Sequence, residues 1–369
     1  MQKRLIIFMP SIEGGGVEKN LFVISNYLSN NINNVTIITA SYLFKKKFNK
    51  KILLINPKYK FWNSLGRRSK YFICLFLLLK EILKNRNTLV FAFQANLYCI
   101  ILCKFLNIKI ITRSNSSPSG WSKNFIKKFL YKTLLQMADQ VIVNSKDFQD
   151  QMKEFFSVNV KCIYNPLDKK NVIFLSKEKV NLKFYNYNDK KNINILNIGR
   201  FVDQKDHLTL LKALKILKNR ISFKMLIIGR GINKNRMVNF IKKNNLSKEV
   251  KIIPFQKNPY KFIKLCNLFV LSSAFEGLPN VLMEASCLRK FVISSNCPTG
   301  PREILSGGKG GFLFKVGNYE ELAKKIEKFY YNKKLYKKKI DYAYKNLYRF
   351  DYNNNLKKYL NLVLTHLNY

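Results

Sequence analysis

The stretch INILNIGRFVDQKDHLTLLKAL, residues 193–214, shows the pattern that decides the fold. A continuous apolar run at Ile193–Ile198 predicts a buried strand, Gly199 ends it, and the apolar spacing after residue 206 predicts an amphipathic helix. The same order of strand, loop and helix recurs on both sides of this stretch. Continuous apolar strands that alternate with helices are typical of a parallel sheet covered on both faces.

The repeated pattern falls into two halves, as the length of 369 residues also favours. Asn165-Pro166 interrupts it, and residues 166–192 are rich in Lys and Asn without a clear period. We therefore predict an α/β chain of two doubly wound, Rossmann-like domains at 1–165 and 193–350, joined by a linker. A C-terminal helix at 353–369 is expected to pack back on the first domain. Since such sheets bind ligands at the carboxyl ends of their strands, we expect the ligand in the cleft between the domains.

The composition limits the kinds of partner and metal site that the chain can have. The 67 Lys and Arg against 21 Asp and Glu give a net charge of +46, but the basic residues are 55 Lys to 12 Arg and there are 43 Asn, which is typical of AT-rich coding. Charge alone therefore does not separate an anionic partner from coding bias. The two histidines, His207 and His366, are too few for a multi-His metal site. Seven cysteines without a CxxC pair indicate reduced thiols in a cytosolic protein. The longest apolar run, residues 71–79, is about half as long as a bilayer crossing requires, so no transmembrane helix is expected.

Three glycine-containing loops are candidate anion sites. Gly14-Gly15-Gly16 follows the first predicted strand and leads into a helix, where backbone amides accept an anion; the alternative is a plain tight turn. The spacing is not GxGxxG and the second strand has no acid at its end, so a nicotinamide dinucleotide is not expected. Arg200 and Lys205 follow the strand at 193–198 and would neutralise a diphosphate, unless they are ordinary surface charges. Arg230 lies in a similar loop, Gly229-Arg230-Gly231.

The segment SSAFEGLPNVLMEA, residues 272–285, places two of the few acidic residues close together. Pro279 suits the first turn of a helix, so Glu276 lies on the loop before it and Glu284 on its second turn among apolar neighbours. Glu276 could be only a partner of the helix dipole and Glu284 only a surface acid, but a carboxylate in apolar surroundings needs a partner. We expect the carboxylates to hold hydroxyls at two ends of a ligand, with an anion on the backbone amides of residues 278–281 between them.

Glu276 and Glu284 are separated by seven residues, and EGLPNVLMEA resembles the EX7E signature of retaining glycosyltransferases of family GT4 with the GT-B fold. GGGVE after the first strand, NIGRFVDQKDHLTLLKAL, IIGRG and GPREILSGGKGGFLFKVGNYEELA are similar to further motifs of that family. The likeness is strong over about residues 193–327 and weak in the N-terminal half. It implies two facing Rossmann-like domains, with the acceptor on the N-terminal one and the nucleotide sugar on the C-terminal one.

The resemblance also implies roles for individual residues. Glu276 would hold hydroxyls of the donor sugar near the anomeric carbon, while Arg200 and Lys205 would bind the donor diphosphate and stabilise the leaving nucleotide. The other implied donor contacts are Gly15, Gly16, Arg230, Pro254, Phe255, Leu278, Pro279, Asn280, Val281 and Glu284, with Glu284 on the ribose and Pro254–Phe255 beside the base. Many members carry a histidine in the N-terminal domain near the donor sugar, and this half has none. We expect Gln94, Arg113 or Asn115 to take its place on the acceptor side.

No Asp-x-Asp pair occurs in the chain. We therefore expect the leaving-group charge to be met by Arg200, Lys205 and helix amides, with no metal and no other cofactor.

The acceptor side carries a marked basic excess. Residues 19–138 contain 21 Lys or Arg and one acid, Glu81, and Trp121–Met137 reads as a basic amphipathic helix. Such helices lie at anionic membrane interfaces, although ordinary packing with a Lys-rich outer face gives the same pattern. We expect a cytoplasmic protein that is peripheral on the inner face of the cytoplasmic membrane.

The expected function is transfer of a hexosyl or N-acetylhexosaminyl group from a UDP-sugar to a glycan or polyprenyl-linked acceptor, with retention, in the synthesis of O-antigen, lipopolysaccharide or capsule. A GDP-mannose-dependent mannosyltransferase of the same family is an alternative. A basic nucleic-acid-binding protein is another, but no zinc-ligand, helix-turn-helix or stacking motif supports specific nucleic-acid binding.

Overall fold

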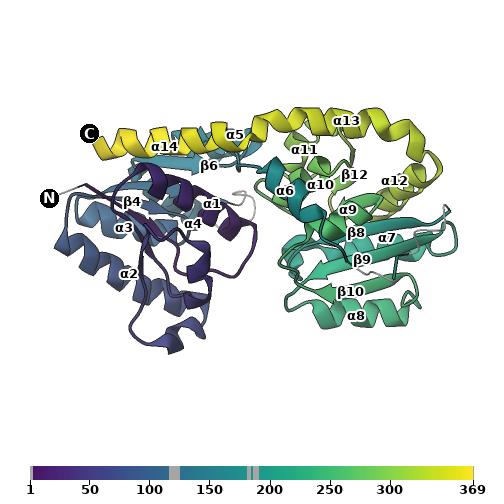
Figure 1. The fold of residues 1–369 in the computed structure, drawn as a ribbon, viewed down its shortest axis with the longest axis horizontal. Coiled ribbons are helices and arrows are strands. Elements are labelled where there is room, and N and C mark those ends of the chain that lie inside the picture. The colour runs from purple at the N-terminus through teal and green to yellow at the C-terminus, as the bar shows by residue number, and fades with distance from the viewer. Residues whose placement is uncertain (1–2, 116–124, 181–183, 186–190, 369) are drawn as a thin grey trace. The chain divides into compact units, whose positions relative to one another are not determined.

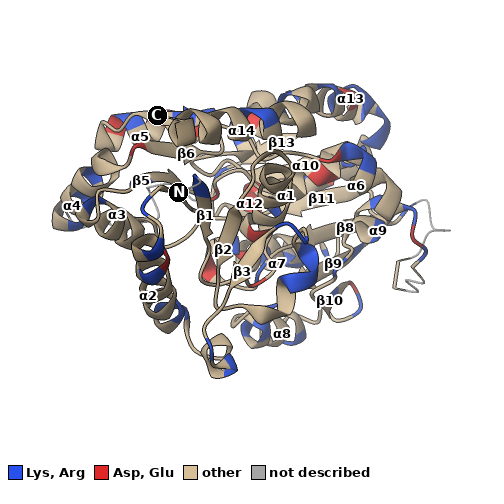
Figure 2. Cartoon of the chain, turned by 60° about the vertical axis from the view of Figure 1, so that its left-hand side comes forward, with Lys and Arg blue, Asp and Glu red and all other residues tan. Residues whose placement is uncertain are grey.

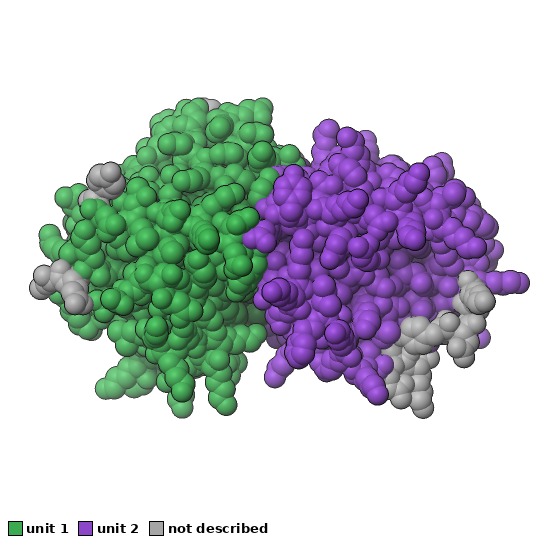
Figure 3. Space-filling view, turned by 45° about the horizontal axis from the view of Figure 1, so that its top comes forward, with its two compact units in different colours: residues 1–166, 352–369 green, residues 167–351 purple. Residues whose placement is uncertain are grey.

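The computed structural model describes residues 3–115, 125–180, 184–185 and 191–368 (Figure 1). The chain divides into two compact units, unit 1 with residues 1–166 and 352–369 and unit 2 with residues 167–351 (Figure 3). Each unit contains one parallel sheet whose strands are separated by helices. The predicted α/β architecture with two parallel-sheet domains is confirmed.

The described part of unit 1 has a seven-stranded sheet in the order β3-β2-β1-β4-β5-β6-β7. The five inner strands of the sheet are mostly buried apolar segments, as a sheet covered on both faces requires, while the edge strands β3 and β7 are partly exposed. They are β1 (Arg4–Phe8), β2 (Val35–Ile38), β3 (Leu53–Ile55), β4 (Thr88–Ala92), β5 (Lys109–Arg113), β6 (Gln140–Val143) and β7 (Val160–Cys162).

Helices cover both faces of this sheet. One face packs against α1 (Gly16–Asn31) and α14 (Tyr352–Asn368), and Leu356, Tyr359 and Val363 of α14 are buried there. The other face packs against α2 (Arg67–Lys84), α3 (Asn96–Phe105), α4 (Phe125–Met137) and α5 (Lys146–Phe156). The C-terminal helix is thus part of unit 1, although residues 167–351, which precede it in the chain, belong to unit 2.

The described part of unit 2 has a six-stranded sheet in the order β10-β9-β8-β11-β12-β13. The strands are β8 (Ile193–Ile198), β9 (Phe223–Gly229), β10 (Val250–Pro254), β11 (Leu268–Leu271), β12 (Phe291–Ser295) and β13 (Phe312–Phe314). The core on one face includes side chains of α7 (His207–Leu217), α8 (Lys234–Lys243) and α12 (Tyr319–Tyr331). Further helices are α9 (Tyr260–Leu265) and α10 (Asn280–Cys287), which contact β8, β11 and β12, together with α11 (Pro301–Ile304) and α13 (Lys337–Lys345).

The stretch 166–192 is not the plain linker that the sequence predicts. Lys169–Ser176 forms helix α6, which the Asp168 side chain caps by accepting a hydrogen bond from the Asn171 amide at 2.9 Å. The helix packs against α9 and α10 within unit 2. Only Val172 and Ser176 of its residues are buried, so its sequence carries too little apolar periodicity to reveal it. Residues 181–183 and 186–190 of this stretch lie outside the described residues.

The ends of β8 and β9 approach each other so closely that only glycine fits. A Cβ atom at Gly229 would lie 1.9 Å from the carbonyl oxygen of Gly199, so Gly229→Ala must push the two strand ends apart. We expect this substitution to lower the free energy of unfolding by at least about 2 kcal/mol, measured by urea denaturation. Gly66→Ala is the matched control, because no heavy atom lies within 4 Å of its Cβ position, and it should change stability by less than about 1 kcal/mol. Equal stability of the two variants would contradict the close approach.

Candidate functional site

The strand order of each sheet reverses at one point, and loops that leave such a point form a natural ligand crevice. In unit 2 the reversal lies between β8 and β11, whose following loops carry Arg200, Lys205 and Glu276. In unit 1 it lies between β1 and β4, whose following loops carry the glycine run and Gln94. The structure therefore places these predicted residues at the edge of the sheet where α/β proteins bind ligands.

Lys205 and Glu276 form an ion pair across the reversal point of unit 2. The Lys205 Nζ atom contacts Oε1 of Glu276, and the Ser273 hydroxyl donates to the same oxygen at 2.7 Å. The two side chains are 16% and 8% exposed. The pair thus puts one positive and one negative charge side by side, nearly buried but each with some exposed surface.

Neighbouring loops fix the main chain around Glu276. The Gln204 carbonyl accepts from the Ala274 amide at 2.8 Å, and the Gln204 side chain donates to the Phe275 carbonyl at 3.0 Å. Thr299, after β12, donates its hydroxyl to the Glu276 carbonyl. Gln204 and Thr299 could not be identified from the sequence, because their bonds join loops that only the fold brings together. Ser273 was also missed, although it lies in the same loop as Glu276, three residues earlier, and its place in SSAFEG was the available signal.

Glu284 lies on α10 and is 4% exposed. The Tyr260 hydroxyl at the start of α9 donates to its Oε1 atom at 3.4 Å. This supplies a partner for a carboxylate in apolar surroundings, as the sequence required. Helix α10 has Pro279 at its N-cap and no side-chain cap; Leu278 and Pro279 are buried, and Asn280 and Val281 are half-buried. The positive end of the helix dipole thus follows directly on the Glu276 loop.

The two arginines predicted for the donor site are exposed. Arg200 donates to the Gln204 side chain at 3.2 Å. Arg230 has its guanidinium 5.0 Å from the centre of the Phe255 ring, so the loops after β9 and β10 meet through a cation–π contact. Pro254 ends β10 next to Gly229 of β9 and is exposed. Arg230, Pro254 and Phe255 therefore form one exposed group at the carboxyl ends of β9 and β10.

The glycine loop of unit 1 is closed by an acid that the sequence analysis did not use. Gly15 is the N-cap of α1, and its amide donates to Oε2 of Glu18 at 2.9 Å, while the Glu13 amide donates to Oε1 at 3.2 Å. The three-residue spacing from Gly15 to Glu18 is the capping-box spacing, which was the available signal. In this structure the Gly15 amide thus faces a carboxylate, and Gly16 begins the helix.

The three acceptor-side candidates differ in exposure. Gln94 is half-buried and accepts from the Ser11 amide at 2.9 Å, which ties the β4 loop to the β1 loop. Arg113 is fully buried and donates to Tyr359 at 3.0 Å, to Asn165 at 2.6 Å and to Asn115. The expectation that Arg113 takes the place of an exposed sugar contact is therefore wrong: it links β5 to α14 in the interior. Asn115 is half-buried and keeps some exposed surface.

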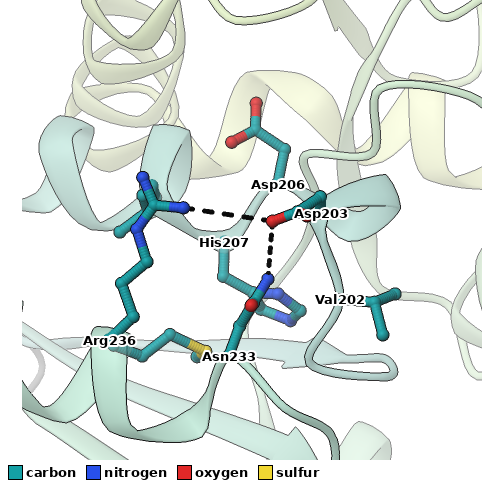
Figure 4. Close-up of a pocket in the computed structure, with 8 residues that line it drawn as sticks. Val202, Asp203, Asp206, His207, Asn233 and Arg236 are labelled. Carbon is teal, nitrogen blue, oxygen red and sulfur yellow. Dashed lines mark hydrogen bonds and ion pairs between the residues drawn. The ribbon is translucent and has the colours of Figure 1, made fainter.

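A separate cavity of about 180 Å³ lies beside the loop after β8 (Figure 4). In it Asp203 contacts Asn233 at 2.8 Å and Arg236 at 3.9 Å, and none of the predicted donor residues lines it. His207 also lines it, 3% exposed, and neither ring nitrogen has a hydrogen-bond partner among the described residues. Burial and nearby Lys205 lower the pKa of His207 to about 4, so the ring is neutral at pH 7. The described residues contain no group of three or more His, Cys, Asp or Glu placed to hold a metal ion.

Two family models match the chain. "Glycosyl transferases group 1" matches residues 179–346, and "Glycosyltransferase Family 4" matches residues 14–171. The first match covers most of unit 2 and the second most of unit 1.

Similar proteins with assigned names include transferases of two bacteria. N-acetylgalactosamine-N,N'-diacetylbacillosaminyl-diphospho-undecaprenol 4-alpha-N-acetylgalactosaminyltransferase of Campylobacter jejuni is 30% identical over 266 residues, which are 70% of this chain and 69% of that protein. The amylovoran biosynthesis glycosyltransferase AmsD of Erwinia amylovora is 25% identical over 319 residues, 83% of this chain and 84% of that one.

Solved structures share the whole fold. HepE of Anabaena, in complex with UDP and glucose, aligns over 99% of this chain and 100% of that chain with a TM-score of 0.79 and 18% identity. Sucrose-phosphate synthase of Thermosynechococcus elongatus aligns over 99% of both chains with a TM-score of 0.82 and 14% identity. The expected GT-B fold is thereby confirmed.

The low pKa of His207 makes the stability of the chain depend on pH. Because the pKa is about 4 in the folded chain and ordinarily 6.5, the unfolded chain binds the proton more readily between these values. Stability is therefore full above pH 6.5 and falls as the pH drops towards 4, by about 2 kcal/mol between pH 7 and pH 5. We expect His207→Asn to remove most of this loss in urea denaturation. His366→Asn, which changes the other of the two histidines, is the control and should keep it; identical pH slopes for wild type and His207→Asn would refute the assignment.

Proposed function

Because this chain belongs to the family 4 glycosyltransferases, enzymes with the GT-B fold, we propose that it moves a sugar from a nucleoside-diphosphate donor to a lipid-linked acceptor in cell-surface polysaccharide biosynthesis. A UDP-sugar is the favoured donor. The transferred group is a hexosyl or N-acetylhexosaminyl group, and its anomeric configuration is retained in the product. The acceptor class is supported by the Campylobacter relative, whose name specifies a diphospho-undecaprenol-linked substrate. The observation that carries the proposal is the Lys205–Glu276 pair at the reversal point of the unit 2 sheet.

In this proposal unit 2 binds the donor. Glu276 accepts hydrogen bonds from sugar hydroxyls, and the amides at the start of α10 receive the phosphates. Glu284 accepts from the ribose, and the Arg230, Pro254 and Phe255 group flanks the base. In unit 1, Gly15, Gly16, Gln94 and Asn115 remain the candidates for contacts to the sugar and acceptor. A phosphate contact through the Gly15 amide requires Glu18 to release that amide.

The proposed reaction breaks the bond between the sugar and the diphosphate and forms a glycosidic bond to the acceptor. The bond from the anomeric carbon to the diphosphate oxygen breaks, and its electrons leave with the nucleotide. The acceptor hydroxyl bonds to the same face of the anomeric carbon, and its proton passes to the departing diphosphate oxygen. Lys205 and Arg200 stabilise the charge that develops on the diphosphate, so we propose that neither a divalent metal nor another cofactor is required.

We expect Glu276→Gln and Lys205→Met each to lower kcat at least about 100-fold, because both act where charge develops in the transition state. The measurement is the initial rate of transfer to a polyprenyl-diphosphate-linked acceptor in EDTA, with UDP-GlcNAc, UDP-GalNAc, UDP-glucose and GDP-mannose compared as donors. Glu320→Gln, an exposed acid on α12, is the matched control and should keep the wild-type rate.

Wild-type rates in both Glu276→Gln and Lys205→Met would refute the proposed site. Turnover with GDP-mannose alone would replace the UDP-sugar by the mannosyl donor, and inversion in the NMR spectrum of the product would refute retention.

A further inference from the structure

Helices α2, α3 and α4 are apolar on two sides. Their inner sides pack on the unit 1 sheet through residues such as Cys74, Leu78, Cys99 and Leu135. Their outer sides carry ten of the 23 large apolar side chains that are exposed among the described residues. We call this set the outer apolar face: Phe72, Phe76 and Leu83 on α2, Tyr98, Ile101 and Phe105 on α3, and Ile126, Phe129, Leu130 and Met137 on α4. A group of large apolar side chains that is exposed on one side of neighbouring helices indicates a second partner besides the core.

The outer apolar face spans three neighbouring helices. Its members recur at helical spacing on each helix, and α3 contacts both α2 and α4. The rings of Tyr71 and Tyr98 lie 6.5 Å apart and join α2 to α3. Figure 2 shows α4, α3 and α2 following one another along the left-hand edge of the view. In unit 2 the exposed large apolar side chains are spread over separate loops and helices instead.

The charges on these helices are almost all positive. Exposed Lys80, Lys84, Lys127 and Lys128 accompany the apolar residues, and blue segments mark the helices in Figure 2. Lys80 also holds its Nζ atom 4.7 Å from the centre of the Phe76 ring. Glu81 on α2 is the acidic residue of these three helices. It is 8% exposed and forms ion pairs with Arg4 and Lys84. This surface therefore fits a partner that is both apolar and anionic.

A bilayer interface with acidic lipids has both properties. Aromatic and aliphatic side chains enter the boundary between headgroups and acyl chains, while lysines reach the phosphates. A second copy of the chain fits less well, because it would bring an equally basic face against this one. None of the helices in the described ranges has the length and apolarity for a bilayer crossing.

We propose that the outer apolar face is the surface by which this protein docks on anionic membranes. This proposal rests on the proposed function in one respect: docking brings the enzyme to its lipid-linked acceptor. Phe105, 86% exposed, and Phe129, 64% exposed, enter the interface, and Lys127 and Lys128 bind headgroups. The sequence predicted a basic amphipathic helix at Trp121–Met137, for which membrane contact and ordinary packing were the two interpretations. Helix α4 begins at Phe125, and Trp121–Asn124 lie outside the described residues; α3 is an addition from the structure.

The test is sedimentation of the full chain with vesicles of phosphatidylcholine alone or with 30% phosphatidylglycerol. The docking variant combines Ile101→Ser, Phe105→Ser, Lys127→Glu and Lys128→Glu, all at exposed positions, so folding should be retained by circular dichroism. A matched variant in unit 2 combines Tyr331→Ser, Leu335→Ser, Lys337→Glu and Lys338→Glu, with the same change in charge. We expect wild type and the unit 2 variant to bind the anionic vesicles, and the docking variant to bind at least about tenfold more weakly.

Equal vesicle binding by the docking and unit 2 variants would overturn the proposal. So would a wild-type dimer that the docking variant dissociates without any loss of vesicle binding, since the face would then join two copies. Glu276→Gln separates the two claims: it should bind vesicles like wild type even if transfer fails. The docking variant should still glycosylate a water-soluble acceptor analogue, while losing rate on an acceptor embedded in anionic vesicles.

Discussion

The ion pair between Lys205 and Glu276 is the interaction on which the site depends. It joins the loops that follow β8 and β11, the two strands on either side of the reversal point in unit 2. Removing two charges from water is unfavourable unless their attraction and further hydrogen bonds offset it, and here Ser273 supplies such a bond. Nearly buried pairs of this kind add little net stability, but they fix where each charge lies. The pair thus places a cation and an anion in direct contact, as the proposed binding of phosphates and sugar hydroxyls requires.

Close backbone approaches keep these loops in place. A Cβ atom at Gly300 would lie 2.1 Å from the Gly277 carbonyl oxygen, and one at Gly231 would lie 2.4 Å from the Phe201 carbonyl oxygen. Both glycines also have positive φ angles, 87° and 151°, which side-chain-bearing residues rarely adopt. The loop after β12 therefore supports the Glu276 loop from one side, and the loop after β9 supports the Arg200 loop from the other. Strand order, glycine positions and the ion pair all act on the same edge of the sheet.

Much of this arrangement could be predicted, because apolar strands and amphipathic helices have distinct periods and the spacing of Glu276 and Glu284 is local. What failed depends on tertiary contacts. Arg113 ends an apolar strand, and nothing in its neighbourhood shows that Tyr359, 246 residues away, will bury it. Helix α6 is short and mostly exposed, so its period is weak. The run YFICLFLLL does not show which of its sides the sheet will cover, since apolar residues occur on every side of this stretch of helix. In the structure Cys74 and Leu78 are buried, whereas Phe72 and Phe76 are exposed.

Hydrogen-exchange mass spectrometry with and without UDP shows whether the donor binds around the Lys205–Glu276 pair, since it maps binding along the whole backbone. We expect UDP to slow exchange at residues 199–205 and 277–283, the loops that carry the Lys205–Glu276 pair and the start of α10. Residues 140–156, in β6 and α5 of unit 1, should exchange at the same rate with and without UDP. Saturating UDP that raises the melting temperature but protects neither unit 2 segment would contradict the account.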